Sequence, residues 1–152
     1  MLFLVFQLGP DRYALDVHCV VEVLPLLDIK RIPQAQPAIA GICNYRGVPV
    51  PVIDLNQLMS NRPAQARFNT RIVLVRYRED DTNERLLGLI AEQVNETVKR
   101  DAADFIDSGV DGGAARYLGP VAPDAAGMLQ WIHVEMLLPP ALRALLFKAQ
   151  AA

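Results

Sequence analysis

The chain has few of the residues from which catalytic and metal sites are built. Its 152 residues include only two cysteines, Cys19 and Cys43, and two histidines, His18 and His133. Two cysteines give no disulfide framework, and no His-x-x-x-His or Glu-x-x-His spacing for a metal is present. We therefore expect free thiols in a reducing compartment, and neither a metal nor another cofactor.

Charge is also scarce and balanced. Charged residues make up 21% of the chain and the formal net charge is −2, whereas 52% of residues are hydrophobic. This composition argues against a nucleic-acid binder, which needs a basic face, and against a disordered tail. No apolar run approaches the roughly 20 residues of a membrane span. Met1–Leu8 is too short for a signal peptide and has no basic segment before it. We predict one cytoplasmic domain over residues 1–152.

Catalytic chemistry is difficult to assemble from these residues. Cys19 follows His18 directly, and adjacent strand residues point to opposite faces, so the two side chains cannot pair directly. The glycines between residues 107 and 113 lack the spacing of a phosphate-binding loop. An enzyme using Cys19 or His133 stays as an alternative, but exposed side chains on a rigid scaffold favour a binding protein.

The pattern of apolar residues predicts short strands over most of the chain. Leu2–Leu8 and Arg12–Val17 are apolar runs joined by Gly9-Pro10-Asp11, a strong turn signal that predicts a hairpin. The first run is apolar on both faces, so we expect it to be buried between layers. Further strands are expected at residues 20–24, 70–77, 86–91 and 128–134, where β-branched and other apolar residues cluster.

Three short helices are expected. Asp54 is placed to cap a helix that runs to Met59, and Pro37 can begin another that ends at Ile39. The third begins near Pro139-Pro140 and carries an apolar stripe, which fits core packing better than a partner surface. The residues of that stripe are Leu142, Leu145, Leu146 and Ala149.

The most specific stretch is a hairpin around residues 44–47. Asn44-Tyr45-Arg46-Gly47 separates the apolar runs 40–43 and 48–53, which places Arg46 at a turn. Pro49 and Pro51 cannot donate ladder hydrogen bonds, so the second strand is expected to be an edge strand or to be bulged there.

An internal repeat is also indicated. Residues 72–75 followed by 87–89 resemble residues 3–6 followed by 13–15 in order and character. Val94-x-Glu96 then repeats Val20-x-Glu22, although hairpins can also resemble one another by chance. Two diverged halves fit two small β-barrels, with a subdomain boundary near the polar residues 60–69.

The hairpin and its flanks resemble the CheW family of coupling proteins in bacterial chemosensory arrays. The matching residues are Pro37, Gly41, Asn44, Arg46, Gly47, Pro51, Asp54 and Leu55, with upstream support from residues 3–6, 13–16 and 20–23. The resemblance implies a mainly β, CheW-like fold. It would contain two five-stranded barrel subdomains packed together, short helices and a C-terminal amphipathic helix.

The resemblance also implies a function. The chain would be a non-enzymatic cytoplasmic adaptor that couples the tip of a chemoreceptor to a CheA-type histidine kinase in membrane-associated arrays. Val20, Glu22, Gly41 and Arg46 occupy the positions that line the receptor groove in the family. Tyr45 departs from the pattern, since the family usually has an aliphatic residue there. A CheW-like regulatory domain of a larger kinase or coupling-phosphatase system is the alternative.

Overall fold

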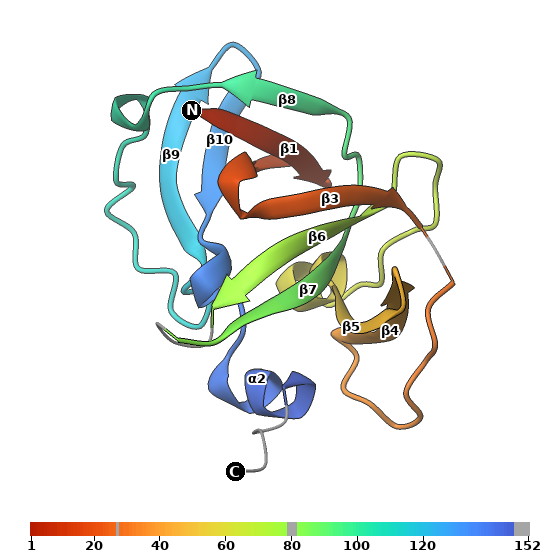
Figure 1. Ribbon diagram of the computed structural model, residues 1–152. Helices are drawn as coiled ribbons and strands as arrows, with labels where there is room; N and C mark the ends of the chain where they lie inside the picture. The colour runs from red at the N-terminus through yellow and green to blue at the C-terminus, as the bar shows by residue number, and fades with distance from the viewer. Residues whose placement is uncertain (27, 79–81, 148–152) are drawn as a thin grey trace.

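The computed structural model describes residues 1–26, 28–78 and 82–147, and this part of the chain is mainly β (Figure 1). Ten strands and two short α-helices are connected by loops and single 3-10 turns. The strands are β1 (Leu2–Leu8), β2 (Asp11–Asp16), β3 (Val20–Pro25), β4 (Ile39–Tyr45), β5 (Val48–Asp54), β6 (Arg71–Arg78), β7 (Glu84–Ala91), β8 (Glu96–Lys99), β9 (Leu118–Asp124) and β10 (Gly127–Ile132). The helices are α1 (Leu55–Ser60) and α2 (Pro140–Leu146), and the 3-10 turns are η1 (Val17–Cys19), η2 (Ala102–Asp104) and η3 (Val134–Met136).

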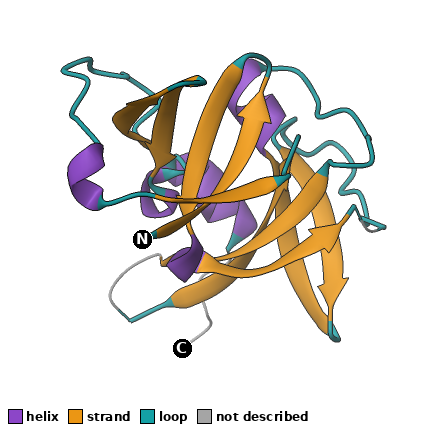
Figure 2. Ribbon diagram, turned by 90° about the horizontal axis from the view of Figure 1, so that it is seen from above, coloured by secondary structure: helices purple, strands orange, loops and turns teal. Residues whose placement is uncertain are grey.

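The strands form two five-stranded sheets, as expected. Sheet A has the order β8-β1-β2-β10-β9, and sheet B has the order β3-β6-β7-β5-β4. Seen from above, both sheets are strongly curved (Figure 2). In the described chain no ladder joins the two edge strands of either sheet. One isolated bridge approaches this closure in each, Lys30 with Ile42 in sheet B and Ile106 with Val121 in sheet A. The expected barrels are therefore open.

The internal repeat is present, but its two halves exchange strands. Strands β1–β5 and β6–β10 follow the same pattern, in which the first two strands join one sheet and the next three join the other. The parallel pairs also correspond, because β2 pairs with β10 in sheet A as β7 pairs with β5 in sheet B. The expected boundary near residues 60–69 thus separates the two halves of the chain. It does not link two barrels, because β5 and β6 on either side of it belong to sheet B.

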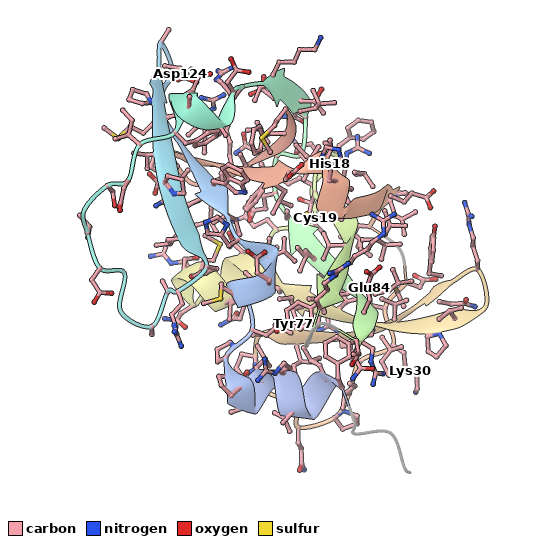
Figure 3. The ribbon with its side chains drawn as sticks, turned by 60° about the vertical axis from the view of Figure 1, so that its left-hand side comes forward. His18, Cys19, Lys30, Tyr77, Glu84 and Asp124 are labelled. Atoms are coloured by element: carbon pink, nitrogen blue, oxygen red, sulfur yellow. The ribbon has the colours of Figure 1, made fainter. Side chains whose placement is uncertain are left out.

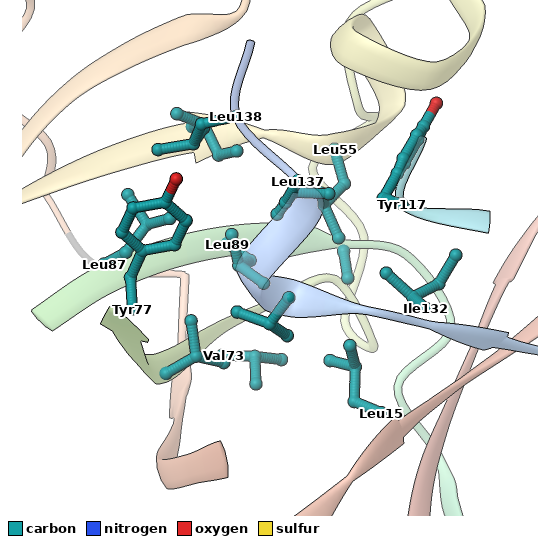
Figure 4. Packing of buried hydrophobic residues seen from close by; sticks show 14 of the residues in the cluster. Leu15, Leu55, Val73, Tyr77, Leu87, Leu89, Tyr117, Ile132, Leu137 and Leu138 are labelled. Carbon is teal, nitrogen blue, oxygen red and sulfur yellow. The ribbon is translucent and has the colours of Figure 1, made fainter. Parts of the chain in front are cut away.

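Alternating residues of each strand enter different cores. In β1, Leu4 and Phe6 face the large core between the sheets, whereas Phe3 and Val5 fill the inside of sheet A. All four are buried, which confirms the prediction for this strand. The core between the sheets is shown in Figure 4, where Leu15 from sheet A lies near Val73 and Leu89 from sheet B. A third cluster fills the inside of sheet B.

Two of the three expected helices form. Asp54 caps α1 by accepting hydrogen bonds from the backbone N–H groups of Asn56 and Gln57 at 2.9 and 3.2 Å. The prediction of a helix from Pro37 to Ile39 is wrong. The Ala38 carbonyl there accepts a hydrogen bond from the Asp54 N–H at 2.8 Å, and Ile39 begins β4.

The C-terminal helix has the expected stripe only in part. Leu142 is buried and Leu146 packs against the core between the sheets, but Leu145 is 64% exposed. Ala149 lies outside the described residues. Part of the stripe is therefore core packing, and Leu145 is left on the surface.

The pairing of β5 explains how a strand with two prolines fits inside a sheet. β5 lies between β7 and β4 and is not an edge strand, contrary to one of the two expectations. Its pairing with β7 begins only at Val52, whereas Pro49 and Pro51 pair with β4 alone. Each proline therefore lies where β5 has one neighbour, so its missing N–H costs no ladder hydrogen bond.

The strand exchange predicts how the protein responds to limited proteolysis. We expect the first cuts in the loops at 61–70 and 107–113, because both are polar and mostly exposed. The two pieces of a chain cut at 61–70 should still elute together in size-exclusion chromatography. Strand β3 of the first piece stays paired with β6 of the second, and β8 of the second stays paired with β1 of the first. Separation without denaturant, or a first cut within Val48–Asp54, would contradict this architecture.

Candidate functional site

The tip of the β4–β5 hairpin is a strained two-residue turn. Tyr45 pairs with Val48, and the residues between them, Arg46 and Gly47, have φ angles of +51° and +84°. Positive φ at both central positions defines a type I′ turn, in which Asn and Gly are preferred. An arginine there costs about 1–2 kcal/mol relative to glycine because its Cβ crowds the backbone. The Asn44 side chain supports the turn by accepting a hydrogen bond from the Gly47 N–H at 2.7 Å.

A bulge in β3 turns Glu22 toward this hairpin. Val20 pairs with Val75, but Glu22 pairs with Leu74, so the register shifts by one residue between them. Paired residues share a face, and Leu74 belongs to the cluster inside sheet B. Glu22 therefore lies on the inner face of sheet B, on the edge strand β3.

Glu22, Tyr45 and Arg46 form one cluster across the open edges of sheet B. The Tyr45 hydroxyl donates a hydrogen bond to Glu22 Oε2 at 2.6 Å, and Arg46 Nη2 lies 3.6 Å from the same oxygen. The Arg46 guanidinium also lies 5.2 Å from the centre of the Tyr45 ring. The hydrogen bond to Glu22 raises the pKa of Tyr45, so the phenol stays a donor at neutral pH. The Arg46 side chain is nevertheless 76% exposed.

The equivalent place in sheet A is arranged differently. Glu96 pairs with Val5 as Glu22 pairs with Leu74, which confirms the Val-x-Glu repeat in space. Glu96 is bound by Arg12 of β2 at 3.1 Å, and Arg12 also binds Asp124 at 2.9 Å. Hydrogen bonding to Arg12 lowers the pKa of Asp124.

Sheet B has no counterpart of this arginine. The ladder position in β7 that corresponds to Arg12 is Leu86, which packs inside the sheet. Glu22 therefore takes its partners from the hairpin tip. The two sheets share a carboxylate at this position, but only sheet B pairs it with an exposed arginine.

The other two predicted site residues lie apart from this cluster. Val20 packs against the core between the sheets, on the opposite face of β3 from Glu22. Gly41 is buried and has a φ of +144°; a Cβ built there would lie 2.1 Å from the Lys30 carbonyl oxygen. Gly41 thus permits the close approach of Lys30 to β4. Tyr45, which departs from the family pattern, also belongs to the cluster.

The alternative nucleophile is unsuited to catalysis. Burial raises the pKa of the Cys19 thiol to about 12, and its Sγ donates to the Asp16 carbonyl oxygen at 2.9 Å. A thiol that stays protonated at neutral pH is a poor nucleophile. In the described chain, no hydrogen bond joins Cys19 to His133, and no group of three His, Cys, Asp or Glu side chains could hold a metal ion.

Two surface hollows lie outside the cluster. One, of about 590 Å³, is mainly apolar and runs between β5 and α2, with Val48, Pro49 and Leu145 on its walls. The other, of about 370 Å³, lies between η1, β6 and η3, and several charged residues line it, among them Asp16, Arg76 and Glu135. His18, Cys19 and Glu84, which are labelled in Figure 3, line this second hollow. Of the described helices, none is long and apolar enough to cross a membrane.

Gly41 can be tested as a structural residue. We expect Gly41→Ala to lower the free energy of unfolding by more than about 2 kcal/mol, because the new methyl would displace the Lys30 backbone. Gly47→Ala is the control, since Gly47 also has a positive φ but nothing within 4 Å of a built Cβ. Urea unfolding gives both values, and equal losses would mean that the contact with Lys30 is unimportant.

Comparison with known proteins identifies the family. The family model described as CheW-like domain matches residues 2–141. The chemotaxis protein CheW of Klebsiella aerogenes is 27% identical over 142 residues, covering 90% of this chain and 80% of that protein. The CheW protein of Bacillus subtilis is 30% identical over 95 residues, covering 62% of this chain and 58% of its own length.

A solved structure supports the same assignment. The crystal structure of the scaffolding protein TtCheW from Thermoanaerobacter tengcongensis aligns with a TM-score of 0.77 and 26% sequence identity. The alignment covers 91% of this chain and 87% of that chain. The chain therefore belongs to the CheW family of chemotaxis scaffold proteins.

Proposed function

We propose that this chain is an adaptor that couples the cytoplasmic tip of a chemoreceptor to a CheA-type histidine kinase. The receptor binds at the hairpin cluster of Glu22, Tyr45 and Arg46, and the kinase's related regulatory domain packs against a flank of one sheet. Membership of the CheW family supports the class of partner. The adaptor works without chemistry of its own, by holding two partners in a fixed relation. It acts in the cytoplasm, at membrane receptor arrays.

The observation that carries the proposal is the conformation of Arg46. A non-glycine residue with positive φ at a hairpin tip destabilises the fold, and strained residues cluster at functional sites. The arginine is not recovering that cost by burial, because its side chain is 76% exposed. Arginine presents a planar fork of donors and is common among residues that dominate binding energy. A partner with carboxylate or carbonyl acceptors fits this position.

The apolar hollow between β5 and α2 suits the kinase contact. Val48 and Leu145, on its walls, are 50% and 64% exposed. Apolar surface of this kind, rimmed by the charged side chains of Glu84 and Arg85, is typical of a protein interface. Arg46 is separated from Val48 by a single residue, so the two partners would lie on adjoining surfaces of one rigid hairpin.

Reversing the charge of Arg46 tests the receptor site. We expect Arg46→Glu to keep the fold but to weaken binding of a receptor-tip fragment by at least about 1–3 kcal/mol, which is roughly 5- to 150-fold in affinity. The new carboxylate would repel Glu22 and remove the donors that the receptor needs. Isothermal titration calorimetry measures the affinity, and binding of the kinase regulatory domain should largely survive.

Arg116→Glu is the matched control, because Arg116 is also exposed but lies on the loop before β9. It makes the same change in net charge away from the hairpin. Wild-type receptor affinity in the Arg46→Glu variant, or an equal loss in both variants, would remove Arg46 from the receptor site.

Strain at Arg46 predicts opposite effects on stability and on binding. Arg46→Asn should raise the free energy of unfolding by about 1 kcal/mol, because asparagine tolerates positive φ at this position of a type I′ turn. The same variant should bind the receptor fragment as poorly as Arg46→Glu does. Arg46→Ala, which keeps the unfavourable φ, should show the loss of binding without the gain in stability. A variant Arg46→Asn that is no more stable than wild type would argue against strain.

A further inference from the structure

Two arginine–carboxylate clusters in this protein show how differently the same pair can be held. In sheet A, Arg12 Nη2 and Nη1 lie 3.1 and 2.9 Å from Glu96 and Asp124, and the arginine side chain is only 13% exposed. In sheet B, Arg46 stays 3.6 Å from Glu22 and is 76% exposed. The first arginine is held by its carboxylates, whereas the second remains open to solvent.

The difference lies at the Tyr45 hydroxyl. Its hydrogen bond to Glu22 Oε2, at 2.6 Å, is the short contact in the cluster, and the longer approach of Arg46 is to that same oxygen. The position equivalent to Tyr45 in the sheet A hairpin is Asp124, which binds the arginine instead of competing with it. A phenol here occupies the oxygen that the guanidinium would otherwise take. Its ring, 5.2 Å from the guanidinium carbon, also supports the arginine from one side.

We propose that Tyr45 is a positioning residue that keeps Arg46 available to the receptor by occupying Glu22 Oε2. Without the hydroxyl, Arg46 closes onto Glu22 as Arg12 closes onto Glu96, and its donors are satisfied within the chain. A partner that needs the guanidinium then has to break this ion pair first. The inference rests on the proposed receptor site and adds the residue that sets the strength of binding there.

This arrangement also defines the chemistry of the matching receptor surface. Arg46 offers donors, and Glu22 Oε1 accepts no hydrogen bond within the described chain. A receptor segment with an acceptor for the guanidinium and a neighbouring donor for Oε1 satisfies both. Side-chain amides of Asn or Gln, which carry an acceptor and a donor on one group, have this character.

Removal of the hydroxyl tests the inference on the full-length protein. Tyr45→Phe keeps the ring, and we expect it to weaken binding of the receptor-tip fragment by about fivefold in calorimetry, the most that an exposed ion pair with Glu22 can cost. The same substitution in a Glu22→Gln background should change the affinity by less than about twofold, because a neutral amide does not capture the arginine. An equal loss in both backgrounds would mean that the hydroxyl contacts the receptor directly, which overturns the inference. No loss in either background overturns it as well.

A second measurement on the free protein makes the inference independent of the receptor. The side-chain Nε–H of Arg46 should show a low heteronuclear NOE in the wild type, where it moves in solvent. It should become markedly more ordered in Tyr45→Phe but not in the double variant with Glu22→Gln. Unchanged Arg46 dynamics would refute the role of Tyr45 even if the receptor binds. If the wild type binds no receptor fragment, the proposed function fails, and the NOE still decides whether Tyr45 holds Arg46 open.

Discussion

The fold depends on the exchange of strands between the two halves of the chain. Each half builds a hairpin in one sheet and then crosses, so that β3 completes the sheet of β6 and β7 while β8 completes the sheet of β1 and β2. Neither sheet can form from a single half. The exchange also places against each other the faces of β1, β2, β6 and β7 that point away from the inside of their own sheets, and most of the buried side chains lie in the resulting core. A scaffold held together in this way can present loops and hairpins rigidly without a cofactor or a disulfide.

Rigidity matters because the candidate site arises where the two halves differ. Both sheets place a glutamate at the same ladder position, Glu96 in sheet A and Glu22 in sheet B. Sheet A neutralises its glutamate internally through Arg12, which is largely buried. Sheet B has Leu86 at the position of Arg12, and its glutamate turns to an exposed hairpin instead. The same architecture thus yields a structural ion pair on one side and an accessible charged cluster on the other.

Much of this fold could be predicted from local patterns in the sequence. The apolar faces of residues 2–8, the turn at 44–47 and the helix cap at Asp54 each follow from chemistry within a few residues. The repeat was visible because Val-x-Glu recurs at a similar distance from a hairpin. The exchange of strands is not visible in the sequence, because long-range pairing decides which sheet each strand joins. Residues 101–117, which contain little regular structure, gave no clear pattern.

Of the four residues expected to line the receptor groove, the structure brings only Glu22 and Arg46 together, and the reason is geometric. Residues two apart on a regular strand share a face, which groups Val20 with Glu22. The bulge between them breaks this rule and sends Val20 into the core while Glu22 faces Tyr45. A bulge changes hydrogen bonding without a reliable signature in the sequence. Gly41 is expected from the family resemblance to line the receptor groove, whereas in the structure its conformation serves the approach of Lys30, which lies eleven residues earlier in the chain.

Coupling itself is the central claim, and one reconstitution tests it directly. Receptors in membrane vesicles and a CheA-type kinase would be combined with and without this protein, and kinase autophosphorylation would be followed by phosphate incorporation. We expect strong stimulation only when all three components are present, and we expect a receptor ligand to suppress it. Equal kinase activity without this chain, or stimulation that ignores the receptor ligand, would contradict its role as an adaptor.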